Sequence, residues 1–325
     1  MLNNAVAMSA TSADRENWLI ADIGASNSRC AVLQSTISEP TDVQVFDNND
    51  FASLSELLAG YIESCTRAPR HCALAVAAPV HGDEVRMINR NWSFTGTALA
   101  NALGLQSVRF LNDFHAIAYA LPALDEQSRI AIGQARKSVD GSMAVLGPGS
   151  GLGMAAWIGN RTDGRVMFGE GGHLTMAGRD RHEDKIIGEF RQQFGHCSAE
   201  RILSGPGLVA LHATMHGLKV SRAEEISGNL ANEKCVATMN QFFSFLGTVA
   251  AELALITGAF GGVYIAGGIV PACIEQIKAS PFRERFEDRN RYREYMQRIP
   301  TYVITDPYPG LRGLRTFLLT DSNRG

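Results

Sequence analysis

Short apolar runs separated by polar and glycine-rich segments predict an α/β chain. Ser53 and Glu56 form a capping box before apolar residues at helical spacing, which predicts a helix. Asn112-Asp113 predicts the start of another helix, which runs to about Leu121. This β-β-β-α-β-α order favours an α/β domain with a mixed sheet. The apolar runs that predict strands in this half are 18–22, 29–33, 43–46, 72–78 and 108–111.

The second half opens as the first does, with a strand, a tight turn and a strand. Strands are predicted at 143–146, 154–158 and 262–266, and helices at 184–194 and 236–257. The apolar tract at 242–273 is long enough for a membrane span, which needs about 20 residues. It contains Glu252, however, and a carboxylate at mid-bilayer costs roughly 2.5–3.5 kcal/mol. A buried helix followed by a glycine turn and a buried strand is therefore the better interpretation.

Composition narrows the class of protein further. The length of 325 residues favours two domains, and 45% hydrophobic with 19% charged residues excludes a disordered chain. A net charge of −3 argues against nucleic acid or an anionic membrane as partner. Six scattered cysteines without a C-x-x-C motif favour a reducing, cytoplasmic location. Residues 1–16 have neither a basic start nor an apolar core, so we expect a disordered lead-in.

The first candidate site follows the first strand, in Asp22-Ile-Gly-Ala-Ser-Asn-Ser28. Gly24 permits a tight turn, and Ser26 and Asn27 offer a hydroxyl, an amide and backbone N–H groups. Such a hairpin can cradle a phosphate while the carboxylate of Asp22 faces a hydrated Mg²⁺. An ordinary polar hairpin is the alternative.

The second candidate site is the stretch Gly147-Pro-Gly-Ser-Gly-Leu-Gly153. Glycines at every second position let the backbone approach an anion closely, and Ser150 adds a hydroxyl. The spacing matches neither a dinucleotide fingerprint nor a Walker A loop. We predict a phosphate loop at Gly147, Gly149, Ser150 and Gly151, with a plain hairpin turn as the alternative.

Gly267-Gly268 ends a buried strand, where a flat base could lie against the backbone, although a simple strand turn fits equally well.

Carboxylates and one histidine supply the remaining candidates. Asp113 follows a buried strand at the edge where α/β sheets bind ligands, so it could be a general base or merely belong to a helix cap. Glu170 and His173 lie three apart in a glycine-rich stretch, and Glu200 follows in Ser198-Ala-Glu-Arg201. These three could hold a metal or grip neighbouring sugar hydroxyls, because a carboxylate accepts two hydrogen bonds. A lone histidine is more often a core residue.

Taken together, these motifs resemble those of the bacterial glucokinase family, ATP-dependent hexokinases of the actin-like ATPase superfamily. The resemblance covers about residues 18–314 in unbroken order. The sugar-kinase family with a Cys/His zinc cluster does not fit, because the sequence has no such cluster. The segments that carry the resemblance are LNDFHAIAYALP, GPGSGLG, GEGGH, SAERILSGPGL, GGVYIAGGIVP and PFRERFEDRNRYREYMQRIPTYVI.

The resemblance implies an α/β, two-domain actin-like ATPase (ribonuclease H-like) fold with an interdomain cleft. The domains would be 17–122 with 305–325, and 123–304. It implies glucose and ATP as substrates, Mg²⁺ as cofactor and phosphoryl transfer to the 6-hydroxyl of glucose, with Asp113 as the base. It implies neither nucleic acid nor membrane as partner, and we leave a homodimer open. The implied sugar-binding residues are Asn89, Asn112, Glu170, His173 and Glu200, and the ATP side comprises Asp22, Gly24, Ser26, Asn27, Gly147, Gly149, Ser150, Gly151, Gly267 and Gly268.

Two departures from the family pattern keep other functions open. Ala25 and Ser26 stand where the family usually has Gly-Thr, and alanine would be strained if this position had a positive φ. The segment 308–315 replaces a smaller, more glycine- and alanine-rich one and could alter contacts on the adenine side. The alternatives are a kinase for another hexose and a catalytically weak sugar-binding or regulatory protein.

Overall fold

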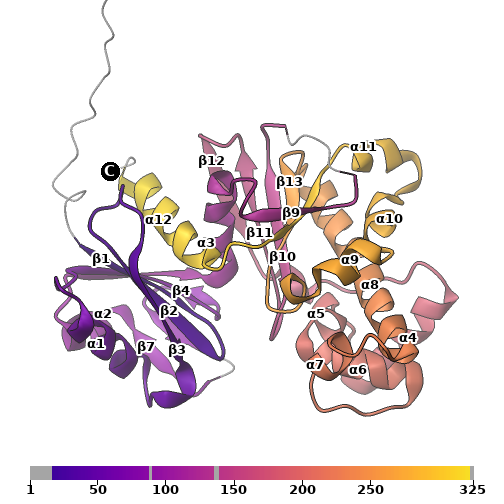
Figure 1. Ribbon diagram of the computed structural model, residues 1–325, viewed down its shortest axis with the longest axis horizontal. Coiled ribbons are helices and arrows are strands. Elements are labelled where there is room, and N and C mark those ends of the chain that lie inside the picture. The colour runs from indigo at the N-terminus through magenta and orange to yellow at the C-terminus, as the bar shows by residue number, and fades with distance from the viewer. Residues whose placement is uncertain (1–16, 88–89, 135–138, 323–325) are drawn as a thin grey trace, which may run out of the picture. The chain divides into compact units, whose positions relative to one another are not determined.

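The computed structural model describes residues 17–87, 90–134 and 139–322, and the chain separates into two compact units (Figure 1). Unit 1 comprises residues 1–123 and 308–325, and unit 2 comprises residues 124–307. The predicted lead-in at 1–16 lies outside the described residues. The division into domains at 17–122 with 305–325 and at 123–304 stays a prediction.

Unit 1 is built on a mixed sheet with the strand order β3-β2-β1-β4-β8. β1 pairs antiparallel with β2 and parallel with β4, which in turn pairs parallel with β8. The predicted strand–turn–strand start and the mixed sheet are therefore confirmed. The strands are β1 (Trp18–Ile23), β2 (Asn27–Leu33), β3 (Thr41–Asp47), β4 (His71–Val76) and β8 (Ser107–Asn112), with a smaller sheet of β5 (Val80–His81), β6 (Glu84–Arg86) and β7 (Ser93–Thr95). The helices are α1 (Leu54–Ser64), α2 (Gly96–Leu103), α3 (Asp113–Ala120) and α12 (Pro309–Ser322).

The continuous apolar run of β1 is explained by burial on both faces of the sheet. Leu19 and Ile23 pack in a core cluster with residues of α1 and α2, whereas Trp18 and Ile20 pack in a second cluster with residues of α3 and α12. Successive side chains of a strand point to opposite faces, so a strand covered on both sides has no polar alternation.

The predicted capping box of α1 forms with one change of partner. Ser53 Oγ accepts a hydrogen bond from Glu56 N (3.1 Å), as expected for an N-cap. Glu56 Oε2, however, accepts from Ala52 N (2.8 Å), one residue before the cap. Both bonds still satisfy backbone donors at the start of the helix.

The C-terminal helix α12 belongs to unit 1, where it packs against α3 and β1 (Figure 1). Two glycines permit the close approach. A Cβ at Gly313 would overlap the carbonyl oxygen of Ala116, and one at Gly310 would lie 2.7 Å from Asp22 Oδ2. The segment 308–315, which departs from the family pattern, therefore packs against α3, the helix that starts at Asp113. The same segment also contacts the carboxylate of Asp22.

Unit 2 contains a six-stranded sheet with the order β12-β11-β10-β13-β14-β9. Its antiparallel pair β10–β11, with β13 parallel to β10, repeats the arrangement of unit 1. The strands are β9 (Arg129–Ile132), β10 (Met143–Pro148), β11 (Leu152–Gly159), β12 (Gly164–Phe168), β13 (Gly262–Ile265) and β14 (Thr301–Ile304). The helices are α4 (Arg181–Phe194), α5 (Ala199–Ile202), α6 (Gly205–His216), α7 (Glu224–Ser227), α8 (Glu233–Thr257), α9 (Ile274–Ala279), α10 (Phe282–Glu287) and α11 (Arg293–Gln297).

α8 is the central helix of the unit 2 core. Among the described residues it is the one helix whose length and composition would allow a membrane span, and 72% of that apolar window is buried inside the structure. Phe242, Phe243 and Phe245 are fully buried on it. These features are those of a core helix, as the sequence predicts.

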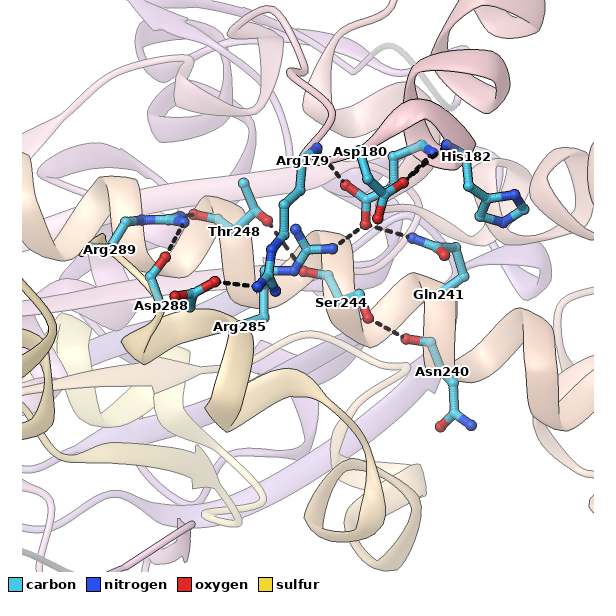
Figure 2. Close-up of polar contacts among 11 residues, drawn as sticks. Arg179, Asp180, His182, Asn240, Gln241, Ser244, Thr248, Arg285, Asp288 and Arg289 are labelled. Carbon is cyan, nitrogen blue, oxygen red and sulfur yellow. Dashed lines mark hydrogen bonds and ion pairs between the residues drawn. The ribbon is translucent and has the colours of Figure 1, made fainter.

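A buried ion pair joins α4, α8 and α10 (Figure 2). Glu183 and Arg285 form a salt bridge with side chains only 2% and 7% exposed. Glu183 Oε1 also accepts from Gln241 Nε2 (3.0 Å), and Glu183 Oε2 accepts from Arg179 N (2.8 Å). Because each carboxylate oxygen has a donor, the charge is compensated despite its burial.

Candidate active site

In unit 1, the β1–β2 turn presents the predicted phosphate-binding side chains to solvent. Gly24 N donates to Asn27 O (3.0 Å), which closes the turn. A Cβ at Gly24 would lie 2.9 Å from that same oxygen, so the turn requires glycine there. Ser26 and Asn27 are exposed, whereas Asp22, just before the turn, has a side chain 18% exposed.

Asn48 is a site residue that the sequence analysis missed. It is fully buried, and its side-chain amide donates to Gly24 O (2.9 Å) while its backbone N–H donates to Ser26 O (2.8 Å). The local sequence Asp47-Asn48-Asn49-Asp50 resembles an exposed polar turn, so no local signal distinguishes the buried asparagine from its neighbours.

Asn112 and Asp113 lie where β8 passes into α3. Asn112 Oδ1 accepts from Phe114 N (3.0 Å) and His115 N (3.3 Å), so the predicted N-cap is confirmed. Asp113 is the first residue of the helix, and its Oδ1 accepts from Phe114 N (2.9 Å). A carboxylate at this end of a helix, beyond the carboxyl end of a parallel strand, can face a ligand.

The environment of Asp113 suits a proton acceptor. The pKa of its carboxyl is raised to about 7: burial is the largest cause, the negative charge of Asp22 adds to it, and hydrogen bonds from Phe114 and Asn112 oppose it in part. Burial also raises the pKa of Asp22, an effect that Arg29 opposes from 4.0 Å away. A base whose pKa lies near the operating pH is the most effective kind.

In unit 2, the glycine loop is shorter than the sequence analysis predicted. Gly147 pairs with Gly153 and Pro148 with Leu152 in the β10–β11 ladder, so only residues 149–151 form the turn. Gly149 N donates to Gly151 O (2.8 Å). The exposed Ser150 lies at the tip.

The predicted sugar residues of unit 2 lie around this hairpin. Glu200 Oε2 accepts from Leu152 N (2.9 Å) and would lie 2.5 Å from a Cβ at Gly151. Glu170 and His173 are exposed in the turn 169–173, whose Gly172 packs against the Leu152 carbonyl. The segment that follows this turn lies beside the helix of Glu200. Two backbone hydrogen bonds of 2.9 Å hold it there, from Met176 N to Cys197 O and from Ala199 N to Leu174 O.

Gly267 and Gly268 reach the same hairpin from β13. Gly267 has φ +87°, and a Cβ there would collide with the Pro148 carbonyl. Gly149 lies opposite, where a Cβ would be 4.0 Å from Gly268 N. Unit 2 thus brings the predicted phosphate loop, sugar segments and adenine-side glycines together.

The role predicted for Asn89 and the absence of a protein-bound metal both stay predictions. Asn89 lies outside the described residues. Among the residues that the structure describes, no three His, Cys, Asp or Glu side chains are disposed to hold a metal ion.

Ala25 is not strained, because it is not among the described non-glycine residues with positive φ. We therefore expect Ala25→Gly to lower the free energy of unfolding by about 0.4–1 kcal/mol, since glycine adds entropy to the unfolded chain. The KM for ATP should stay within about twofold. Thermal melting and ATP kinetics check both values; a stabilised variant with a higher kcat would mean that the natural turn is impaired.

The chain is similar to known proteins over most of its length. The family model described as Glucokinase matches residues 19–321. The glucokinase of Aromatoleum aromaticum is 41% identical over 310 residues, which cover 92% of this chain and 94% of that protein. The crystal structure of a glucokinase from an Antarctic psychrotroph has a TM-score of 0.82 at 31% identity and covers 94% of this chain and 99% of that one.

A more distant structure shares the fold alone. Glucokinase from Balamuthia mandrillaris, solved in complex with glucose, has a TM-score of 0.71 at 18% identity and covers 97% of this chain and 95% of that one. The family match and the relatives at 31% and 41% identity define a sugar kinase. More narrowly, the chain belongs to the glucokinase family.

Proposed function

We propose that this chain transfers the γ-phosphoryl group of ATP to the 6-hydroxyl of glucose, giving glucose 6-phosphate and ADP. The observation that carries the proposal is Asp113, a carboxylate with a pKa of about 7 at the start of α3, in a chain matched by the family over 19–321. Its carboxylate accepts the hydroxyl proton, the 6-oxygen bonds to the γ-phosphorus, and the bond from that phosphorus to the bridging oxygen of ADP breaks.

The remaining site residues align the reactants, which is the main task in phosphoryl transfer. Asn89, Asn112, Glu170, His173 and Glu200 bind sugar hydroxyls. The two glycine turns and Gly267-Gly268 bind ATP. Mg²⁺ enters with ATP as part of the substrate, and Asp22 faces its hydration shell. The cleft predicted between the domains would exclude water, which would otherwise hydrolyse ATP.

The compartment and assembly belong to the same proposal. All six cysteines are free thiols, as expected for a reducing cytoplasm. A homodimer stays open, and sedimentation tests it. The alternative of a regulatory protein rested in part on strain at Ala25, and Ala25 is not strained.

A coupled assay tests the function directly. ATP turnover should depend on glucose and be much slower with mannose, fructose or N-acetylglucosamine at equal concentration. A preference for one of these sugars would favour the alternative of another hexose kinase. Glucose binding without turnover would favour the regulatory alternative.

The pH dependence follows from the state of Asp113. The carboxyl must be deprotonated to accept a proton, so kcat/KM for glucose should fall about tenfold per pH unit below about pH 7. His115→Gln is the matched control, because burial lowers the pKa of His115 to about 4 and removes it from this range. A profile without this limb would argue against Asp113 as the base.

A further inference from the structure

Arg90 follows Asn89, which the family resemblance assigns to the sugar, yet the hydrogen bonds of Arg90 lead to the β1–β2 turn. Its Nη2 donates to Asn48 O (2.6 Å), and its Nη1 donates to Asn49 Oδ1 (3.2 Å) and Ala25 O (3.4 Å). The guanidinium lies over the ring of Trp92, 4.6 Å from its centroid. Since these contacts fix the plane of the guanidinium, its donors are aimed at the turn.

Trp92 is itself anchored to the same part of unit 1. It is 6% exposed, and its Nε1 donates to Ala52 O (3.1 Å). Arg90 is therefore held between a buried aromatic ring and the backbone that follows β3.

Asn48 and Arg90 together bind every carbonyl oxygen of the turn from Gly24 to Ser26. Asn48 Nδ2 binds Gly24 O, Arg90 Nη1 binds Ala25 O, and Asn48 N binds Ser26 O. Ser28 Oγ donates to Asn48 Oδ1 (2.6 Å) and holds the amide in this orientation. Carbonyl oxygens carry partial negative charge, so leaving them free beside a phosphate would repel it. Bound as they are, they leave the exposed Ser26 and Asn27 to receive an anion.

We infer that Arg90 and Asn48 are positioning residues of the nucleotide site, which set the affinity for the phosphates of ATP and not the affinity for glucose. The inference rests on the proposed assignment of the β1–β2 turn to ATP. Arg90 adds a positive charge beside the turn, and Asn48 fixes its backbone.

Kinetics of Arg90→Ala and Arg90→Lys test the inference. In Arg90→Ala the KM for ATP should rise about tenfold or more, because a charged donor is lost, while the KM for glucose changes less than about threefold. Arg90→Lys should lie between, since lysine keeps the charge but not the planar fork. Arg86→Ala, at an exposed arginine of β6, is the matched control and should leave both constants unchanged.

Direct binding separates positioning from a general loss of structure. By calorimetry, Arg90→Ala should weaken binding of the ATP analogue AMP-PNP about tenfold and leave adenosine binding within about twofold, because only the analogue carries phosphates. Equal losses for both ligands, or a rise in the glucose KM that matches that for ATP, would overturn the inference. So would wild-type affinity for AMP-PNP in Arg90→Ala.

The outcomes also distinguish failure of the proposed function from failure of the inference about Arg90. Wild-type protein that binds AMP-PNP but phosphorylates no glucose would remove the glucokinase proposal, and the binding comparison would still decide the role of Arg90. Wild-type protein without affinity for AMP-PNP would overturn both.

Discussion

Asp113→Asn is expected to lower kcat by about 10²–10⁴-fold, the usual contribution of a general base. The amide cannot accept the proton of the 6-hydroxyl, but its Oδ1 can still accept from Phe114 N, as the carboxylate does at 2.9 Å. Binding of glucose should therefore stay within about threefold of the wild type. Steady-state kinetics and glucose calorimetry measure the two effects. A variant that keeps more than about a tenth of kcat would exclude base catalysis of this size.

Asp113→Asn should also change how the free energy of unfolding depends on pH. The pKa of Asp113 is raised from 3.8 to about 7 in the folded protein, so the folded state binds its proton more tightly than the unfolded state. Wild-type stability is therefore lost as the pH rises through this interval. Asparagine has no such titration. Relative to the wild type, Asp113→Asn should gain stability between about pH 4 and 7 and keep the gain above it. A melting difference that does not vary with pH would argue against the raised pKa.

Local patterns were sufficient for much of unit 1. The apolar run at 18–22 and the capping box at Ser53 depend on neighbours along the chain, and both predictions are confirmed within one or two residues. The N-cap at Asn112 is confirmed for the same reason. Their determinants are burial periodicity and hydrogen bonds within a helical turn.

Contacts between distant segments could not be predicted in this way. Asn48 binds the turn at Gly24 and Ser26, and only the pairing of β2 with β3 brings them together. The glycine loop ends at Gly151 because Leu152 and Gly153 continue the ladder with β10, which spacing alone does not reveal. The family resemblance pointed to Asn89 as a sugar residue, but it does not show that the guanidinium of the neighbouring Arg90 binds the β1–β2 turn.

The second large effect is expected at the buried ion pair of unit 2. Arg285→Met should lower the free energy of unfolding by about 3–5 kcal/mol, because it leaves the charge of Glu183 buried without its partner. Gln241 and the Arg179 N–H still donate to that carboxylate, but neither carries a formal charge that could replace the guanidinium. Denaturant unfolding followed by ellipticity measures the loss.

A double-mutant cycle shows whether the charge or the packing is responsible. Glu183→Met combined with Arg285→Met removes both charges and fills similar volume, so it should recover most of the stability that Arg285→Met loses. Lys278→Met is the surface control: Lys278 and Glu275 are 41% and 83% exposed, and its loss should cost less than about 1 kcal/mol. If the double variant were as unstable as Arg285→Met, the loss would come from the stem of Arg285, which packs beside Gly247 of α8, and not from the uncompensated carboxylate.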